Sequence, residues 1–193
     1  MPMTDTHAPR AYTSARDPDP ERERITRFWD PGRKLLRALR RYQHWHARQG
    51  VIAGFMRRYW VLVHRYWSVI CQCDIPVITP IGRGLVLHHP NGVVMHPAAV
   101  IGPNCMIFNQ VTIGSGRTND EGRNVPLIGG HVDIAAGARI VGGVTIGDHA
   151  VIGLNAVVLD DVPPGGVAVG VPARVIRIEP PPIEETPIEE NGA

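Results

Sequence analysis

The chain has 193 residues, of which 44% are hydrophobic and 20% are charged, with a formal net charge of +2. This composition fits one globular domain with appendages. The polar N-terminus excludes a secretory signal, and three arginines and a histidine within residues 51–70 exclude a transmembrane helix. The cysteines are Cys71, Cys73 and Cys105. Their odd number without a secretion signal favours reduced thiols and a cytoplasmic location.

The first part of the chain divides into a polar segment and a helical region. Residues 1–25 are polar and contain proline, and we expect them to be disordered. Asp30 followed by Pro31 is typical of a helix start, and apolar residues then recur at helical spacing, which predicts a helical hairpin within 26–72.

The hairpin region is strongly basic and aromatic. Residues 27–67 hold ten arginines or lysines, one acid and all four tryptophans. We expect an apolar stripe of the second helix to pack on a core. The stripe consists of Phe55, Met56, Tyr59, Trp60, Val63 and Trp67. The alternative is a basic patch that contacts a membrane surface or a nucleic acid. We expect no nucleic-acid partner, and we retain peripheral membrane contact of the basic helices as the alternative.

A six-residue period dominates the rest of the chain. From residue 128 an Ile or Val recurs at every sixth position, and the fifth position of each block is small or β-branched. The recurring residues are Ile128, Ile134, Ile140, Ile146, Ile152 and Val158. The same register extends upstream to residue 81, with a two-residue slip at Val93 and Val94. A period of six indicates a solenoid in which three short strands complete a coil of 18 residues. We therefore predict a mainly β fold, a hexapeptide-repeat β-helix over 73–177.

Two segments depart from this rhythm. Residues 115–126, "SGRTNDEGRNVP", are polar and glycine-rich, which predicts a loop extruded from the prism. A long loop in a compact solenoid is more often functional than not. The acidic, proline-rich residues 178–193 are expected to be a disordered tail. Cys105 lies at a fifth position of the repeat, so we expect it to pack in the core.

The repeat region resembles the hexapeptide-repeat acyltransferases, and specifically the serine O-acetyltransferases. The resemblance covers residues 74–177 and includes "DIPVITPIGRGLVLHHPNGVVM", "NQVTIGSG", "PLIGGHVDIAAGARIVG" and "AVVLDDVPPGGVAVGVPARVI". It implies left-handed coils, an exception to the usual right-handed crossover. It also implies that His89 is the catalytic base and that Asp74, fifteen positions earlier, orients it.

The chain departs from that family at the positions that hold the acceptor. His88 stands where the serine enzymes have an aspartate that pairs with the amino acid, and a neutral histidine can only accept one hydrogen bond from an ammonium. In the loop, Asn124 and its neighbour replace an Arg-His pair that grips the substrate, although Arg117 and Arg123 are nearby. We therefore expect His88, Asn124, Arg117 and Arg123 to contact the acceptor. The reduced helical region is a third departure.

The resemblance also implies a mechanism and an assembly. A histidine can take the proton from an acceptor hydroxyl near neutral pH, and attack on acetyl-CoA would be direct, without an acyl-enzyme. Coenzyme A would lie in a groove between the subunits of a homotrimer, with the active sites shared between them. The positions that match this groove are Gly114, Ser115, Ala136, Leu154 and Arg174.

Four functions therefore compete. Serine acetylation for cysteine synthesis is the favoured function, and acetylation of a sugar or another small hydroxylated metabolite is the runner-up. His131 and His149 lie one coil apart and should stack about 5 Å from each other. Such a pair suggests a zinc hydratase, but a third ligand is missing, so we expect no metal. A non-catalytic adaptor that docks through the basic hairpin is the fourth.

Overall fold

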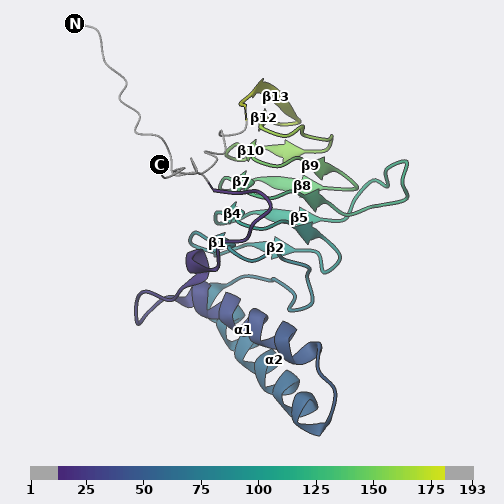
Figure 1. The fold of residues 1–193 in the computed structure, drawn as a ribbon. Coiled ribbons are helices and arrows are strands. Elements are labelled where there is room, and N and C mark those ends of the chain that lie inside the picture. The colour runs from purple at the N-terminus through teal and green to yellow at the C-terminus, as the bar shows by residue number, and fades with distance from the viewer. Residues whose placement is uncertain (1–12, 181–193) are drawn as a thin grey trace, which may run out of the picture.

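The computed structural model describes residues 13–180, most of which form a prism of stacked coils (Figure 1). Three parallel sheets make its faces, and up to β10 each sheet takes every third strand. The first face contains β1 (Val86–Leu87), β4 (Met106–Ile107), β7 (Asp133–Ile134), β10 (Val151–Ile152) and β12 (Gly166–Gly170). The second contains β2 (Val94–Met95), β5 (Thr112–Gly114), β8 (Arg139–Val141) and β11 (Val157–Val158). The third contains β3 (Val100–Ile101), β6 (Leu127–Ile128) and β9 (Thr145–Ile146). This arrangement confirms the predicted β-helix.

The strand register shows where the repeat is regular and where it is not. Asp133 pairs with Val151, 18 residues later, which is one regular coil. Val86 pairs with Met106, 20 residues later, so this coil holds the two extra residues of the predicted slip. Met106 pairs with Asp133, 27 residues later, because this coil carries the extruded loop. Both insertions leave the sheets in register because they lie at corners of the prism.

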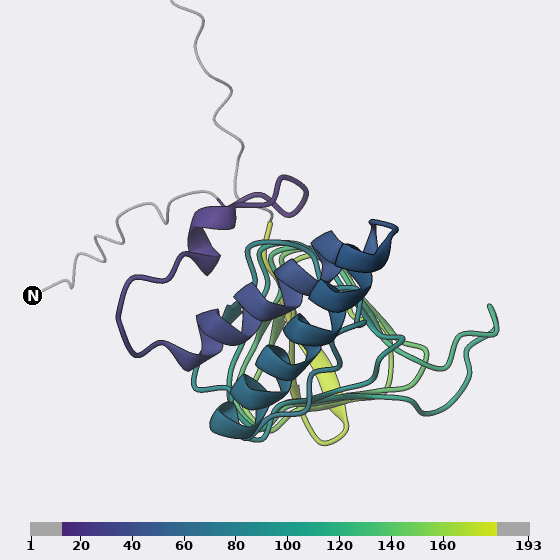
Figure 2. The same cartoon turned by 90° about the horizontal axis from the view of Figure 1, so that it is seen from below.

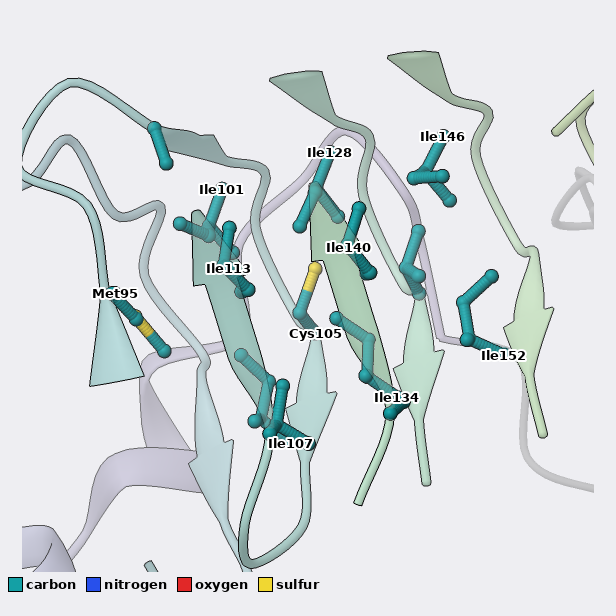
Figure 3. Packing of buried hydrophobic residues seen from close by; sticks show 14 of the residues in the cluster. Met95, Ile101, Cys105, Ile107, Ile113, Ile128, Ile134, Ile140, Ile146 and Ile152 are labelled. Carbon is teal, nitrogen blue, oxygen red and sulfur yellow. The ribbon is translucent and has the colours of Figure 1, made fainter. Parts of the chain in front are cut away.

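The core is a column of aliphatic side chains along the prism axis (Figure 3). Ile107, Ile134 and Ile152 are stacked on the first face and are at most 1% exposed. Burial of each such side chain contributes about 1.5–3 kcal/mol. Cys105 is also fully buried in this column, and its burial raises the thiol pKa to about 12. The thiol therefore stays protonated, as its predicted packing role requires.

The corner between the third and first faces needs left-handed backbone in every coil. Gly84, Asn104, His131, His149 and Gly165 all have positive φ there. The His131 and His149 rings lie 5.0 Å apart between centroids, as predicted, and their Nδ1 atoms are 2.9 Å apart. Histidine and asparagine tolerate this conformation better than most residues, which accounts for their place in the column.

The N-terminal segment differs from the prediction. Residues 1–12 of the expected disordered segment lie outside the described residues, but residues 13–25 are ordered and contain η1 (Pro20–Glu23). Asn104 fixes this segment: its Nδ2 donates to the carbonyls of Ser14 and Asp17, each at 2.8 Å, and its Oδ1 accepts from Asp19 N at 2.8 Å. The low hydrophobicity of this segment suggested disorder. The buried Asn104 instead forms hydrogen bonds with three backbone groups of the segment and holds it against the prism.

Two helices cap the end of the prism where the coils begin (Figures 1 and 2). α1 (Pro31–His46) starts at Asp30, whose side chain accepts from Arg33 N, and its buried face includes Leu35, Leu36 and Leu39. Arg40 anchors α1 by donating to the carbonyls of Ile81 and Gly82, each at 2.6 Å. None of the helices in residues 13–180 is long and apolar enough to cross a membrane.

The second helix is less buried than predicted. α2 (Val51–Cys71) packs against α1, and its buried residues are Ala53, His64, Ser68 and Cys71. Phe55 and Tyr59 of the predicted stripe are instead 68% and 47% exposed, while Trp60, Val63 and Trp67 are partly buried. Helical periodicity alone could not tell which face would meet α1, because apolar side chains lie on more than one face of α2.

The remaining departures from the prism lie at its edges. The loop that begins after β5 projects well away from the coils (Figure 2). At the far end β13 (Ala173–Ile178) pairs antiparallel with β12 and closes the last coil. The backbone of Glu179 still donates to Gly165 O at 2.8 Å. Residues 181–193 of the expected tail lie outside the described residues.

Candidate active site

The two adjacent histidines lie in a turn at the corner between the first and second faces, which we call the first corner. They directly follow β1, so the alternation of strand side chains does not apply to them, and both are exposed. His89 has φ 51°, and its left-handed backbone turns the chain there. The His88 ring stacks on Phe108 of the next coil at 4.9 Å.

Asp74 lies on the segment next to this turn. Its backbone N donates to Val93 O at 2.8 Å, and Gly92 N donates to Gln72 O at 2.8 Å, so the two segments run side by side. Within the described chain, however, no hydrogen bond joins the carboxylate of Asp74 to His89. Instead the charge of Asp74 acts on the buried His64. Both Asp74 and His89 are exposed, so rotation of their side chains is open to them.

A cleft opens beside the turn, between the prism and the helical hairpin. Its wall includes His88 and His89 from the turn, Asp30 and Arg33 from the start of α1, and Cys71 from the end of α2. Cys71 is buried, and a hydrogen bond from the Cys73 thiol lowers its pKa while it raises that of Cys73. Sequence reasoning missed the hairpin residues, because only the docking of α1 brings them to the turn.

The loop residues predicted to contact the acceptor lie elsewhere. Residues 115–126 leave the prism at the corner between the second and third faces, which we call the second corner. Arg117 and Asn124 are exposed there. Arg123 instead folds back and donates to Thr145 Oγ1 at 2.8 Å, so its guanidinium anchors the loop. The contact of Arg123 with the acceptor stays a prediction.

Asn119 organises the loop, which the sequence analysis did not predict. Its Nδ2 donates to Gly143 O at 2.9 Å, and its Oδ1 accepts from Arg123 N at 2.9 Å and from Glu121 N at 3.1 Å. An asparagine that precedes Asp and Glu-Gly in a polar stretch is typical of such a turn, so the signal was present in "NDEG". The loop is therefore held in one shape even where it leaves the prism.

The five positions predicted to hold coenzyme A are also divided. Ala136 and Leu154 lie at the first corner with His89, and Leu154 is 71% exposed. Gly114 ends β5, and Ser115 starts the loop at the second corner. Arg174 lies on β13, where it pairs with Asp160 at 3.1 Å. One chain thus presents two partial surfaces at two corners of its prism.

Comparison with known proteins leads to serine acetyltransferases. No protein-family model matches the chain. The serine acetyltransferase of Escherichia coli K12 is 39% identical over 145 residues, 74% of this chain and 51% of its own length. The crystal structure of the Neisseria gonorrhoeae serine acetyltransferase in complex with serine matches with TM-score 0.63 and 31% identity over 77% of this chain and 58% of that chain. A serine acetyltransferase in complex with CoA matches with TM-score 0.62 and 29% identity over 77% and 57%.

The chain is homologous to serine acetyltransferases over about three quarters of its length, which is consistent with the hexapeptide-repeat acyltransferase family. Its fold is the left-handed parallel β-helix of that family. The chain spans about half the length of the curated relatives it matches.

In this chain the zinc hypothesis gains no support from the geometry. The paired Nδ1 atoms of His131 and His149 face each other. Across residues 13–180 no group of three or more His, Cys, Asp or Glu side chains could hold a metal ion. The pair lies at the third corner, between the third and first faces, whereas His89 lies at the first.

Proposed function

We propose that the protein transfers the acetyl group of acetyl-CoA to the hydroxyl of L-serine, with His89 as the general base. One observation carries this proposal: comparisons by sequence and by fold both lead to serine acetyltransferases, over about three quarters of the chain. Solved relatives are in complex with serine and with CoA. They favour serine over a sugar or another hydroxylated metabolite as the acceptor.

The chemistry follows from the exposed position of His89 beside the cleft. His89 would accept the proton of the serine hydroxyl while the serine oxygen attacks the thioester carbonyl carbon. Collapse of the tetrahedral intermediate breaks the C–S bond, and the coenzyme A thiolate takes up the proton from His89, which becomes neutral again. Asp74 would orient the ring once the two exposed side chains rotate toward each other, and it would stabilise the imidazolium.

We also propose a homotrimer with shared sites. The histidine turn and the loop occupy different corners of one prism, so a cleft between neighbouring prisms would combine the first corner of one subunit with the second corner of the next. Ala136 and Leu154 would then face Gly114 and Ser115 of another copy across the coenzyme A groove. A cytoplasmic location suits an enzyme that uses acetyl-CoA. Peripheral membrane contact of the basic hairpin remains an untested alternative for that region.

The test is release of free coenzyme A from acetyl-CoA in the presence of L-serine or of a panel of sugars. We expect turnover with serine, and we expect His89→Ala to lower kcat by about 10²–10⁴-fold, the usual contribution of a general base. His46→Ala is the matched control, since His46 is an exposed histidine at the end of α1, outside the first and second corners of the prism. Turnover with a sugar and not with serine would falsify the proposed acceptor, and full activity of His89→Ala would contradict the proposed base.

A further inference from the structure

The start of α1 forms the wall of the cleft opposite the histidine turn. Gly32 is buried at this contact: a Cβ atom there would lie 3.5 Å from Leu87 O and 3.6 Å from Pro90 Cγ. A close approach of this kind holds the first turn of α1 directly against the residues that flank His88 and His89. Side chains next to Gly32 in the sequence therefore reach the same cleft.

Two of these side chains carry opposite charges. Asp30 and Arg33 form an ion pair at 3.2 Å, with 19% and 33% of the two side chains exposed. Thr26 Oγ1 accepts from Arg33 Nη1 at 2.9 Å and holds the guanidinium in place. Among the described residues that line the cleft, Asp30 is the only acid. A wall with one fixed carboxylate and one fixed guanidinium is complementary to a zwitterion such as an amino acid.

The charge of Asp30 matters because the histidine turn has no negatively charged side chain that could bind an ammonium group. By the resemblance to the serine O-acetyltransferases, His88 stands where those enzymes have an aspartate that pairs with the amino acid. The His88 ring is stacked on Phe108. We propose that Asp30 supplies the missing carboxylate: it binds the ammonium of the acceptor, while Arg33 binds the acceptor carboxylate. This assignment rests on the proposed function, in which the acceptor is L-serine. It places a substrate-binding group on the hairpin, outside the repeat.

The variant Asp30→Asn separates charge from structure. Asparagine caps a helix as well as aspartate does, so α1 should keep its start while the charge is lost. Because a hydrogen bond to a charged group contributes more than a neutral one, we expect the KM for L-serine to rise by about 10–100-fold. The KM for acetyl-CoA should stay within about twofold. The midpoint of thermal unfolding should fall by no more than about 4 °C, because a partly exposed ion pair adds little to stability. Leu62→Ala, at an exposed position of α2, is the matched surface control.

A second variant tests the same charge from the other wall. In the Asp30→Asn background, His88→Asp restores an acid on the turn, and we expect the KM for serine to return to within about threefold of the unmodified chain. A rescue of this kind would not follow from a structural role of Asp30. It would support the assignment even if Asp30→Asn also lowered stability.

The outcomes that overturn the assignment differ from those that overturn the function. If the unmodified chain acetylates serine and Asp30→Asn leaves its KM unchanged, Asp30 does not bind the ammonium, and the proposed function stands. A rise in both KM values that His88→Asp does not reverse would make Asp30 a structural residue only. If the unmodified chain does not acetylate serine at all, the proposed acceptor and this assignment both fall.

Discussion

At the scale of single residues, His64 is the buried titratable group with the clearest consequence for stability. It is 7% exposed, and its Nε2 has no hydrogen-bond partner within residues 13–180. Burial, and then the charge of Arg65, lower its pKa from 6.5 to about 4, while Asp74 opposes the shift. Below pH 6.5 the unfolded chain therefore binds a proton that the folded chain does not, so stability is lost as the pH falls toward 4.

The free energy of unfolding should show this loss. The difference between the two pKa values corresponds to about 3 kcal/mol, present in full above pH 6.5 and lost progressively down to pH 4. The variant His64→Gln has no such titration. Urea denaturation of both proteins should therefore give a difference in free energy that falls by about 3 kcal/mol between pH 7 and pH 4. A difference that is constant over this range would show that His64 is not held neutral.

At the scale of elements, the two helices contribute unequally to the fold. α1 buries its leucines, whereas α2 leaves large apolar side chains exposed on the face away from α1. Leu36 is 1% exposed and Leu62 is 70% exposed. A leucine-to-alanine substitution at each position compares the stability contributed by a buried and by an exposed side chain. Helix propensity changes little, because leucine and alanine both favour helices.

We expect Leu36→Ala to lower the free energy of unfolding by about 2–5 kcal/mol, since it removes buried contacts and leaves a cavity. Leu62→Ala should change it by less than about 0.5 kcal/mol. Urea denaturation followed by circular dichroism gives both values. Similar large losses at the two positions would mean that the outer face of α2 is covered, and the description of α2 as an exposed helix would then be wrong.

At the scale of the whole molecule, the site is divided between two corners of the prism. His89 lies at the first corner, while Arg117 and Asn124 lie at the second. Arg117 and Asn124 make no side-chain hydrogen bonds within the described part of the chain, so their truncation should leave the fold intact. Subunits that are defective at different corners can therefore test whether neighbouring chains share one site.

The experiment mixes His89→Ala chains with Arg117→Ala/Asn124→Ala chains, after denaturation and joint refolding. Each variant alone should have low activity. In a trimer with shared sites, about one site in four of an equal mixture would combine an intact histidine turn with an intact loop. The rate of coenzyme A release should then rise to about a quarter of the unmodified value. No increase on mixing would place the whole site on one chain and contradict the shared cleft.

Much of the fold was determined by the sequence itself. Ile128, Ile134 and Ile140 open successive six-residue blocks whose fifth position is small or β-branched, a pattern typical of a three-sided coil. The start of α1 at Asp30 and the extrusion of residues 115–126 are equally local, because each depends on residues adjacent in the chain. His89 was singled out by the surrounding motif, and its role as a base remains a proposal.

The tertiary structure decided what depends on distant segments. Only the packing of α1 on the turn brings Asp30 and Arg33 to the cleft beside His89, more than fifty residues away in the chain. Only the folded structure shows that Arg123 donates a hydrogen bond to Thr145. It likewise shows that Asn104 holds residues 14–19 through hydrogen bonds. A six-residue period fixes which side chains enter the prism, but it carries no information about what rests against the corners. Those contacts depend on the shape of the prism surface and on the polar groups exposed at its corners. Both exist only once the coils have stacked.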